Sequence, residues 1–209
     1  IFNTKKENNL IVHFTTELPE NPSDVFLAEV DTSKRLLIEN NHTSTHLLHE
    51  ALRTVLGRHV EQKGSLVNDQ YLRFDFSHFS KMTEEEVQQV EVIVNAKIRE
   101  NIALNEKRSV PMSEAEQMGA MMLFGEKYGD AVRVIQFGSS VELCGGCHVP
   151  STGQIGVFKI SSEAGVAAGI RRIEAITSEV AFEYYKKQEE TLNTLCSLLK
   201  NSNDPLKGV

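Results

Sequence analysis

The chain has 209 residues, of which 40% are hydrophobic and 24% charged, so it can bury the core of an ordinary globular protein. Its formal net charge of -7 argues against a broad electrostatic surface for nucleic acid, and we expect any RNA contact to be small and local. Three cysteines exclude a disulfide framework, and no apolar run could cross a bilayer or act as an export signal, so we expect a cytoplasmic protein.

The first forty residues predict short strands and turns. Leu10–Phe14 and Val25–Val30 have strand character, and prolines separate them, which indicates part of a small β subdomain. An amphipathic helix is predicted from Thr43 to Gly57. The run Leu72–Ser77 then alternates with period two, as a half-buried strand does.

Two capping signatures predict the starts of further helices. In Thr83–Glu86 and Ser113–Glu116 a hydroxyl residue precedes a glutamate by three positions, and a polar turn at 125–130 follows the second helix. A terminal helix is predicted from Ser178. Between the turn and that helix we expect four strands: Ala131–Phe137, Val141–Leu143, Ile155–Ile160 and Ile170–Ile176.

A pair of histidines and a later cysteine–histidine segment together predict a metal site. His42 and His46 are four residues apart, so on a helix both imidazoles lie on one face. About a hundred positions later, Cys144 and His148 add a thiolate and a third imidazole. This mixed nitrogen and sulfur set suits zinc better than calcium or magnesium.

Other chemistries for these motifs fit less well. A zincin metalloprotease needs a glutamate beside the first histidine, where Thr43 stands. The run Cys144–His148 also satisfies the haem-attachment pattern, but that modification normally follows export. His59 and Glu61 before a Cys-x-x-Cys segment faintly suggest a nucleobase deaminase, without the proline that precedes its first cysteine. A redox dithiol also stays open, although no helix clearly follows Cys147.

A glycine segment and two arginines precede the terminal helix. The spacing of Gly165 and Gly169 is wrong for a phosphate loop. Arg171 and Arg172 could meet phosphate, but on a strand only one of them can point at a given ligand. A surface salt bridge is the simpler interpretation.

Several ordered blocks, taken together, closely resemble the editing domain of alanyl-tRNA synthetases. The resemblance covers residues 25–180 and is more specific than any one motif. The blocks that carry it are Asn41–His49, Gln62–Val67, Leu72–Phe76, Leu123–Asp130, Glu142–His148 and Gly169–Ala175.

The resemblance implies an α+β fold shared with the editing domain of threonyl-tRNA synthetases, with a two-layer mixed sheet and packed helices. It implies that residues 1–40 end a small β-barrel subdomain, that 41–178 form a zinc-containing editing core, and that 179–209 form a long helix leading to a further domain. Both ends look cut, and because the first residue is Ile1 we expect an excised fragment that lacks the aminoacylation site.

The resemblance also assigns the site. It implies Zn²⁺ held by His42, His46, Cys144 and His148, and it leaves open whether Cys147, where the family usually has threonine, joins the metal. Gln62 is placed in the editing pocket, and we add Thr45 as a second candidate catalytic group. The candidate groups for binding substrate or tRNA are Ser65 and Arg171.

The expected activity is hydrolysis of serine or glycine from tRNA(Ala), in partnership with the remaining domains of an enzyme that ligates alanine to this tRNA using ATP. No general base is indicated by spacing, so a water or a vicinal ribose hydroxyl is expected in that role. Two alternatives stay open: a zinc-stabilised module that binds the tRNA acceptor end without activity in isolation, and a free-standing editing hydrolase.

Overall fold

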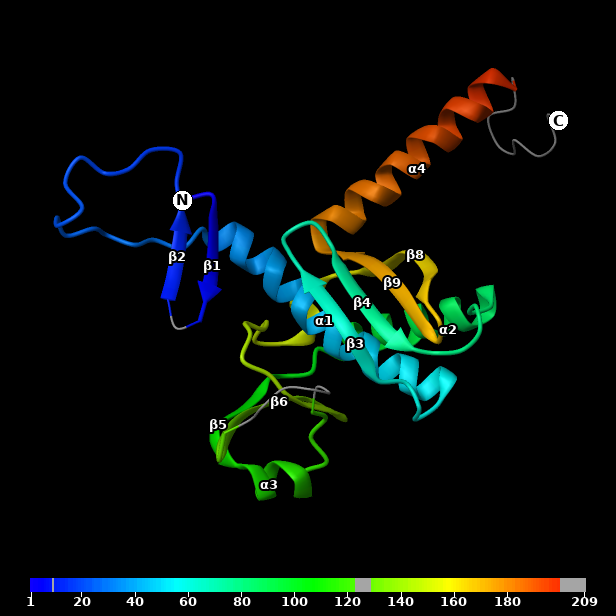
Figure 1. Cartoon of the computed structure of the whole chain (residues 1–209). Coiled ribbons are helices and arrows are strands. Elements are labelled where there is room, and N and C mark those ends of the chain that lie inside the picture. Colours follow the sequence, from blue (N-terminus) through cyan, green and yellow to red (C-terminus); the bar gives the residue numbers. More distant parts are fainter. Residues whose placement is uncertain (9, 123–128, 200–209) are drawn as a thin grey trace. The chain divides into compact units, whose positions relative to one another are not determined.

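The structure is a computed structural model that describes residues 1–8, 10–122 and 129–199. The chain divides into two compact units between Asp31 and Thr32 (Figure 1). The polar turn predicted at 125–130 falls mostly on residues 123–128, which lie outside the described residues.

The first unit, Ile1–Asp31, contains one β-hairpin. Strand β1 (Asn3–Glu7) pairs antiparallel with β2 (Leu10–Phe14). The strand predicted at Leu10–Phe14 is therefore confirmed. No closed barrel is formed by the described residues of this unit. The strand predicted at Val25–Val30 is wrong: these residues have no regular structure, because among the described strands of this unit β1 and β2 pair only with each other.

The second unit packs helices against a four-stranded sheet, so the predicted α+β class is confirmed. Every pair of neighbouring strands in this sheet is antiparallel, where we expected a mixed sheet. Short hairpin connections permit only that orientation for β3 with β4 and for β8 with β9. In spatial order the strands are β3 (Gln62–Val67), β4 (Leu72–Ser77), β9 (Ile170–Thr177) and β8 (Phe158–Ala167).

Helices α1 (Thr32–Leu56) and α2 (Glu84–Arg99) supply one side of the main hydrophobic core. The core side chains of α1 recur at the spacing of one helix face and meet alternate side chains of β4 and β9. The fully buried members include Leu47, Leu48, Leu52, Phe74, Phe76 and Ile173. This core fixes the middle of α1, the stretch that carries His42 and His46.

A second, three-stranded antiparallel sheet lies beside its own smaller core. It contains β5 (Asn105–Pro111), β6 (Ala131–Phe137) and β7 (Ser140–Leu143), in that order. Helix α3 (Met112–Gln117) buries Ala115 against Val132, Val134 and Leu143. Strand β7 ends at Leu143, so the predicted metal-binding segment leaves this sheet directly at Cys144.

Helix boundaries differ from the predictions in informative ways. Helix α1 begins at Thr32, well before the predicted Thr43, and its extra turns are more exposed than its middle. The Thr83 capping box is confirmed: the Glu86 amide donates to Thr83 Oγ1 at 3.1 Å, and the Thr83 amide donates to Glu86 Oε2 at 2.8 Å. The second box does not form, because α3 starts at Met112 with Pro111 as its N-cap.

The C-terminal part of the chain follows the predicted order with shifted ends. The strand expected at Ile155–Ile160 is divided into a 3₁₀ turn, η1 (Thr152–Ile155), and the start of β8. Helix α4 (Ser178–Leu198) begins where the terminal helix was predicted. No helix among the described residues combines the length and the apolar character that a membrane span requires.

Candidate metal centre

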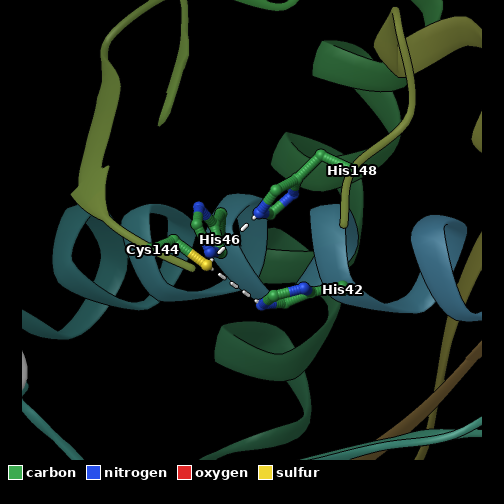
Figure 2. Close-up of side chains that lie close together, drawn as sticks. All are labelled: His42, His46, Cys144 and His148. Carbon is green, nitrogen blue, oxygen red and sulfur yellow. Dashed lines mark hydrogen bonds between the residues drawn. The ribbon is translucent and has the colours of Figure 1, made fainter. Parts of the chain in front are cut away.

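Four predicted ligands converge on one point in the second unit. His42 and His46 project from the same face of α1, and Cys144 and His148 come from the segment after β7 (Figure 2). One ligand atom from each side chain lies within 4.8 Å of every other. The sequence separation between the two pairs is about a hundred residues, so the fold, and not local spacing, brings them together.

The thiol sulfur lies between two imidazoles. Cys144 Sγ is 3.4 Å from His42 Nε2 and 3.4 Å from His148 Nε2, the two contacts drawn in Figure 2. The ring centroids of His42 and His148 are 4.3 Å apart, and that of His46 lies 4.5 Å from the His148 centroid. Three nitrogen donors and one sulfur donor thus surround a space of the size that a small cation fills.

Hydrogen bonds on the outer sides of the rings orient two of the imidazoles. His42 Nδ1 lies 3.1 Å from the Cys147 carbonyl oxygen, and because a carbonyl only accepts, this nitrogen carries the proton. Nε2 of His42 is therefore a lone-pair donor facing Cys144. His148 Nδ1 meets Thr43 Oγ1 at 3.1 Å, which leaves its Nε2 facing the same sulfur.

A buried glutamate, Glu142, lies beside His46. Glu142 Oε2 is 3.6 Å from His46 Nε2, and Glu142 Oε1 is 3.1 Å from His49 Nδ1. All three side chains are buried, and the Nδ1 atom of His46 has no hydrogen-bond partner among the described residues. A buried nitrogen without a partner is costly, which is the condition that a bound cation or a shift of the ring would relieve.

Burial sets the protonation states of the cluster. It lowers the pKa of His42 and His46, and it lowers the pKa of His148 to about 3, with the neighbouring His42 adding to the effect. Burial raises the pKa of the Cys144 thiol. At neutral pH the imidazoles are neutral and can donate lone pairs, while the thiol must lose a proton to become a metal ligand.

Close packing shapes the turn between the two later ligands. The Gly146 amide donates to Cys144 Sγ at 3.4 Å, and a Cβ atom at Gly146 would overlap the His42 ring. Cys147 lies outside the four-residue cluster, although its carbonyl contacts His42. The glycine is therefore required for the close approach of this turn to α1.

The candidate pocket residues lie on α1 and β3. Gln62 Nε2 donates to Ser65 Oγ at 3.2 Å, a pairing made by the β-bulge between Gln62 and Gly64. Thr45 is buried and its hydroxyl donates to the Asn41 carbonyl at 2.9 Å. No hydrogen bond between described residues joins Gln62, Ser65 or Thr45 to the four-residue cluster.

Arg171 is held in an ion pair. Its Nε and Nη2 atoms donate to the Glu163 carboxylate at 2.6 and 2.7 Å, and Arg172 makes the same two-pronged contact with Asp75 at 2.6 and 2.8 Å. The two neighbouring arginines thus take different partners, as the alternation of a strand requires.

Sequence reasoning missed three residues that contact the ligands: Thr43, Arg133 and Glu142. Thr43 and Glu142 lie next to ligand motifs in the sequence, and their positions beside His42 and Cys144 were the available signal. Arg133 gave none, because it alternates on a strand like any exposed arginine.

Two comparisons with known proteins show similarity to aminoacyl-tRNA synthetases. Residues 132–174 match the family described as threonyl and alanyl tRNA synthetase second additional domain. The chain is 57% identical over its full length to an alanine-tRNA ligase of Christiangramia forsetii and 58% identical to one of Cytophaga hutchinsonii, covering 24% of each. An alanine-tRNA ligase of Bacteroides fragilis is 58% identical over 98% of the chain and 23% of the relative.

These matches cover the chain but only part of each relative. The chain spans about a quarter of the length of the relatives it matches, and the family match includes Cys144 and His148. The chain is therefore similar along its whole length to one part of these alanine-tRNA ligases, and residues 132–174 within it match the second additional domain family.

Proposed function

We propose that this chain hydrolyses the ester that joins serine or glycine to the terminal adenosine of tRNA(Ala). It would thereby edit mischarged tRNA for a parent enzyme that ligates alanine to tRNA(Ala) using ATP. The observation that carries the proposal is the convergence of His42, His46, Cys144 and His148 in a segment that matches alanine-tRNA ligases.

Zn²⁺ is the cofactor that this donor set favours. Three imidazoles and one thiolate are a four-donor set of the type that binds zinc, and soft sulfur disfavours magnesium and calcium. His46 Nδ1, which has no hydrogen-bond partner in the described part of the chain, and the tight approach of Gly146 to His42 also fit a site that holds an ion. When bound, zinc supplies positive charge that polarises a carbonyl or a water where a ligand position is open.

The number of protein ligands decides between two roles for the ion. Three protein ligands leave a position for water, whereas four close the site and favour a structural or positioning role. Because four side chains converge here, we propose that the centre fixes α1 and the segment after β7 relative to each other. The ester and the adenosine would then be held beside this rigid centre.

The protein's own polar groups would recognise the amino acid. The amide of Gln62 and the hydroxyl of Ser65 are adjacent on β3, and we propose that they bind the hydroxyl of serine. The buried Thr45 hydroxyl donates to its own helix, so its oxygen is left to accept a hydrogen bond from the substrate. Alanine has no hydroxyl, and its entry would leave these polar groups unpaired; because glycine also lacks a hydroxyl, this contact explains the release of serine and not that of glycine.

A separate editing site of this kind corrects errors that the aminoacylation site cannot avoid. A synthetic site sized for alanine cannot exclude the smaller glycine, and an added hydroxyl is rejected only on the order of a hundredfold by an apolar pocket. Discrimination by hydrogen bonding in a separate site is much stronger. The partner is therefore the acceptor end of tRNA(Ala), and Arg171 stays a proposed tRNA contact that would have to exchange its Glu163 ion pair for phosphate.

The test is release of serine from Ser-tRNA(Ala), measured beside Ala-tRNA(Ala). We expect the zinc-loaded chain to release serine and spare alanine. Cys144→Ala removes one ligand and should abolish release, and Cys147→Ala is the matched control because that cysteine lies outside the cluster.

Two outcomes would contradict the proposal. Equal activity of Cys144→Ala and the unchanged chain would separate hydrolysis from the metal centre. No release by folded, zinc-loaded protein that still binds the tRNA acceptor end would favour a binding module that needs the rest of the synthetase for activity.

A further inference from the structure

Arg133 contacts the segment between the two later ligands at three points. Its Nη1 atom donates to the carbonyl oxygen of Cys144 at 2.9 Å and to that of Gly146 at 2.6 Å. Its own carbonyl accepts a hydrogen bond from the Cys144 amide at 3.2 Å. No sequence motif assigned this residue to the site.

The contacted segment has no regular secondary structure to define its shape. Residues 144–148 form no helix or strand, and a Cβ atom at Gly145 would meet nothing within 4 Å. Fixing such a segment costs conformational entropy of roughly 1–2 kcal/mol for each residue. Two carbonyls held by one planar guanidinium remove much of the freedom that separates Cys144 from His148.

The same contacts aim the ligand atoms. Arg133 holds the Gly146 carbonyl, and the Gly146 amide donates to Cys144 Sγ at 3.4 Å. Gly146 in turn lies against the ring of His42. A shift of this glycine would therefore move both the thiol and an imidazole of the cluster.

A carboxylate on the neighbouring strand anchors the guanidinium. Glu106 Oε1, on β5, accepts from Arg133 Nε at 2.7 Å. Glu106 also accepts from Arg108 Nε at 2.7 Å, but the Arg108 side chain is 80% exposed, and its hydrogen bonds within the described part of the chain go to Glu106 and not to the ligand segment. Arg108 and Arg133 thus both bind the Glu106 carboxylate, but Arg133 is the one that also contacts the ligand segment.

We propose that Arg133, anchored by Glu106, is the positioning residue that preorganises the segment 144–148 for the metal. The proposal rests on the zinc site proposed above and names what gives that site its geometry. A lysine cannot replace Arg133 fully, because a single ammonium lacks the rigid fork that bridges two carbonyls and a carboxylate.

The test compares Arg133→Lys, Arg133→Met and the matched control Arg108→Lys. Zinc affinity is measured on the full chain by competition with a chromophoric chelator. We expect affinity to fall about 10- to 100-fold in Arg133→Met and less in Arg133→Lys, as it does when groups supporting metal ligands are removed. Arg108→Lys should keep the affinity of the unchanged chain.

A spectroscopic readout separates positioning from general stability. With Co²⁺ in place of zinc, the thiolate-to-cobalt absorption band should shift or weaken in the Arg133 variants and stay unchanged in Arg108→Lys. Thermal unfolding of the metal-free proteins in chelator records any loss of stability independently of the metal. If Arg133→Met fails to fold, the smaller changes in Arg133→Lys and Glu106→Gln carry the test.

The outcomes distinguish this proposal from the one on which it rests. Failure of the unchanged chain to bind zinc would refute the metal site, and with it any role for Arg133 there. Zinc binding by the unchanged chain with equal affinity and an equal cobalt spectrum in folded Arg133 variants would overturn the positioning role alone.

Discussion

Gly146 lies against the imidazole of His42 so closely that a Cβ atom in its place would overlap the ring. The φ angle of Gly146 is not positive, so its backbone does not adopt the left-handed conformation that favours glycine. Its requirement for glycine is therefore steric and comes from the ligand across the site.

We expect Gly146→Ala to weaken zinc binding about tenfold or more, because the added methyl group must displace either His42 or the ligand segment. Gly145→Ala is the matched control, since a Cβ there meets nothing within 4 Å. Titration of both variants against a metal chelator measures the difference. Equal affinities would mean that the segment moves freely enough to absorb the methyl group.

Zinc binding should release close to one proton near neutral pH. Burial raises the pKa of Cys144, so its thiol is protonated in the metal-free protein, whereas the lowered pKa values of His42, His46 and His148 keep those rings neutral. Calorimetric titration in buffers of different ionisation enthalpy gives the proton count. Release of about two protons would instead indicate that Cys147 also binds as thiolate.

Thr43→Val should harm both folding and metal binding. The Thr43 hydroxyl is fully buried, meets His148 Nδ1 at 3.1 Å and accepts from the Val149 amide at 3.2 Å. Valine has nearly the same shape as threonine but no hydroxyl, so the partners of the Thr43 hydroxyl would be left without a hydrogen bond. This should lower the unfolding free energy by about 1–3 kcal/mol.

The control for this substitution lies on the same helix. Thr54 is exposed, and among the described residues its hydroxyl donates only to the Glu50 carbonyl, so Thr54→Val should change the unfolding free energy and zinc affinity little. Urea unfolding in chelator and zinc titration test both variants. A Thr43→Val protein as stable as Thr54→Val would show that the hydroxyl contributes nothing net.

The contribution of Glu106 to stability should disappear in acid. Hydrogen bonds from Arg108 and Arg133 lower its pKa from 4.5 to about 2 in the folded chain. A lowered pKa means that the folded state binds the proton less well, so the stabilisation is present above pH 4.5 and is lost as the pH falls toward about 2.

Glu106→Gln removes that titration. Its unfolding free energy should lie below that of the unchanged chain at neutral pH, and the gap should narrow as the pH drops below 4.5. Urea unfolding of both proteins at a series of pH values measures the gap. A gap that stays constant through this range would show that the charge of Glu106 does not stabilise the fold.

Short sequence patterns correctly predicted those features that depend on residues close together in the sequence. The i,i+4 spacing of His42 and His46 needs only a helix, and the capping box at Thr83 needs only four residues. The contacts of Glu142 with His49 and of Thr43 with His148 join residues that are 93 and 105 positions apart. Such contacts depend on tertiary packing, which periodicity does not encode.

The errors in the fold have the same origin. Val25–Val30 has strand composition but forms no strand among the described residues, whereas Asn105–Pro111 has a polar sequence and forms β5. Strand β5 exists because β6 offers it a partner along its length. A strand is a property of a pair, so composition alone misjudged both segments.

The ligands also determine how the chain is cross-linked. A metal held by His42 and Cys144 would close a loop that spans 102 positions and contains the described elements β3, β4, α2, β5, α3, β6 and β7. Closing a long loop restricts the unfolded ensemble, as a disulfide does. Where thiols are kept reduced, one ion would then cross-link this segment reversibly, and the cross-link would depend on zinc supply and not on disulfide formation.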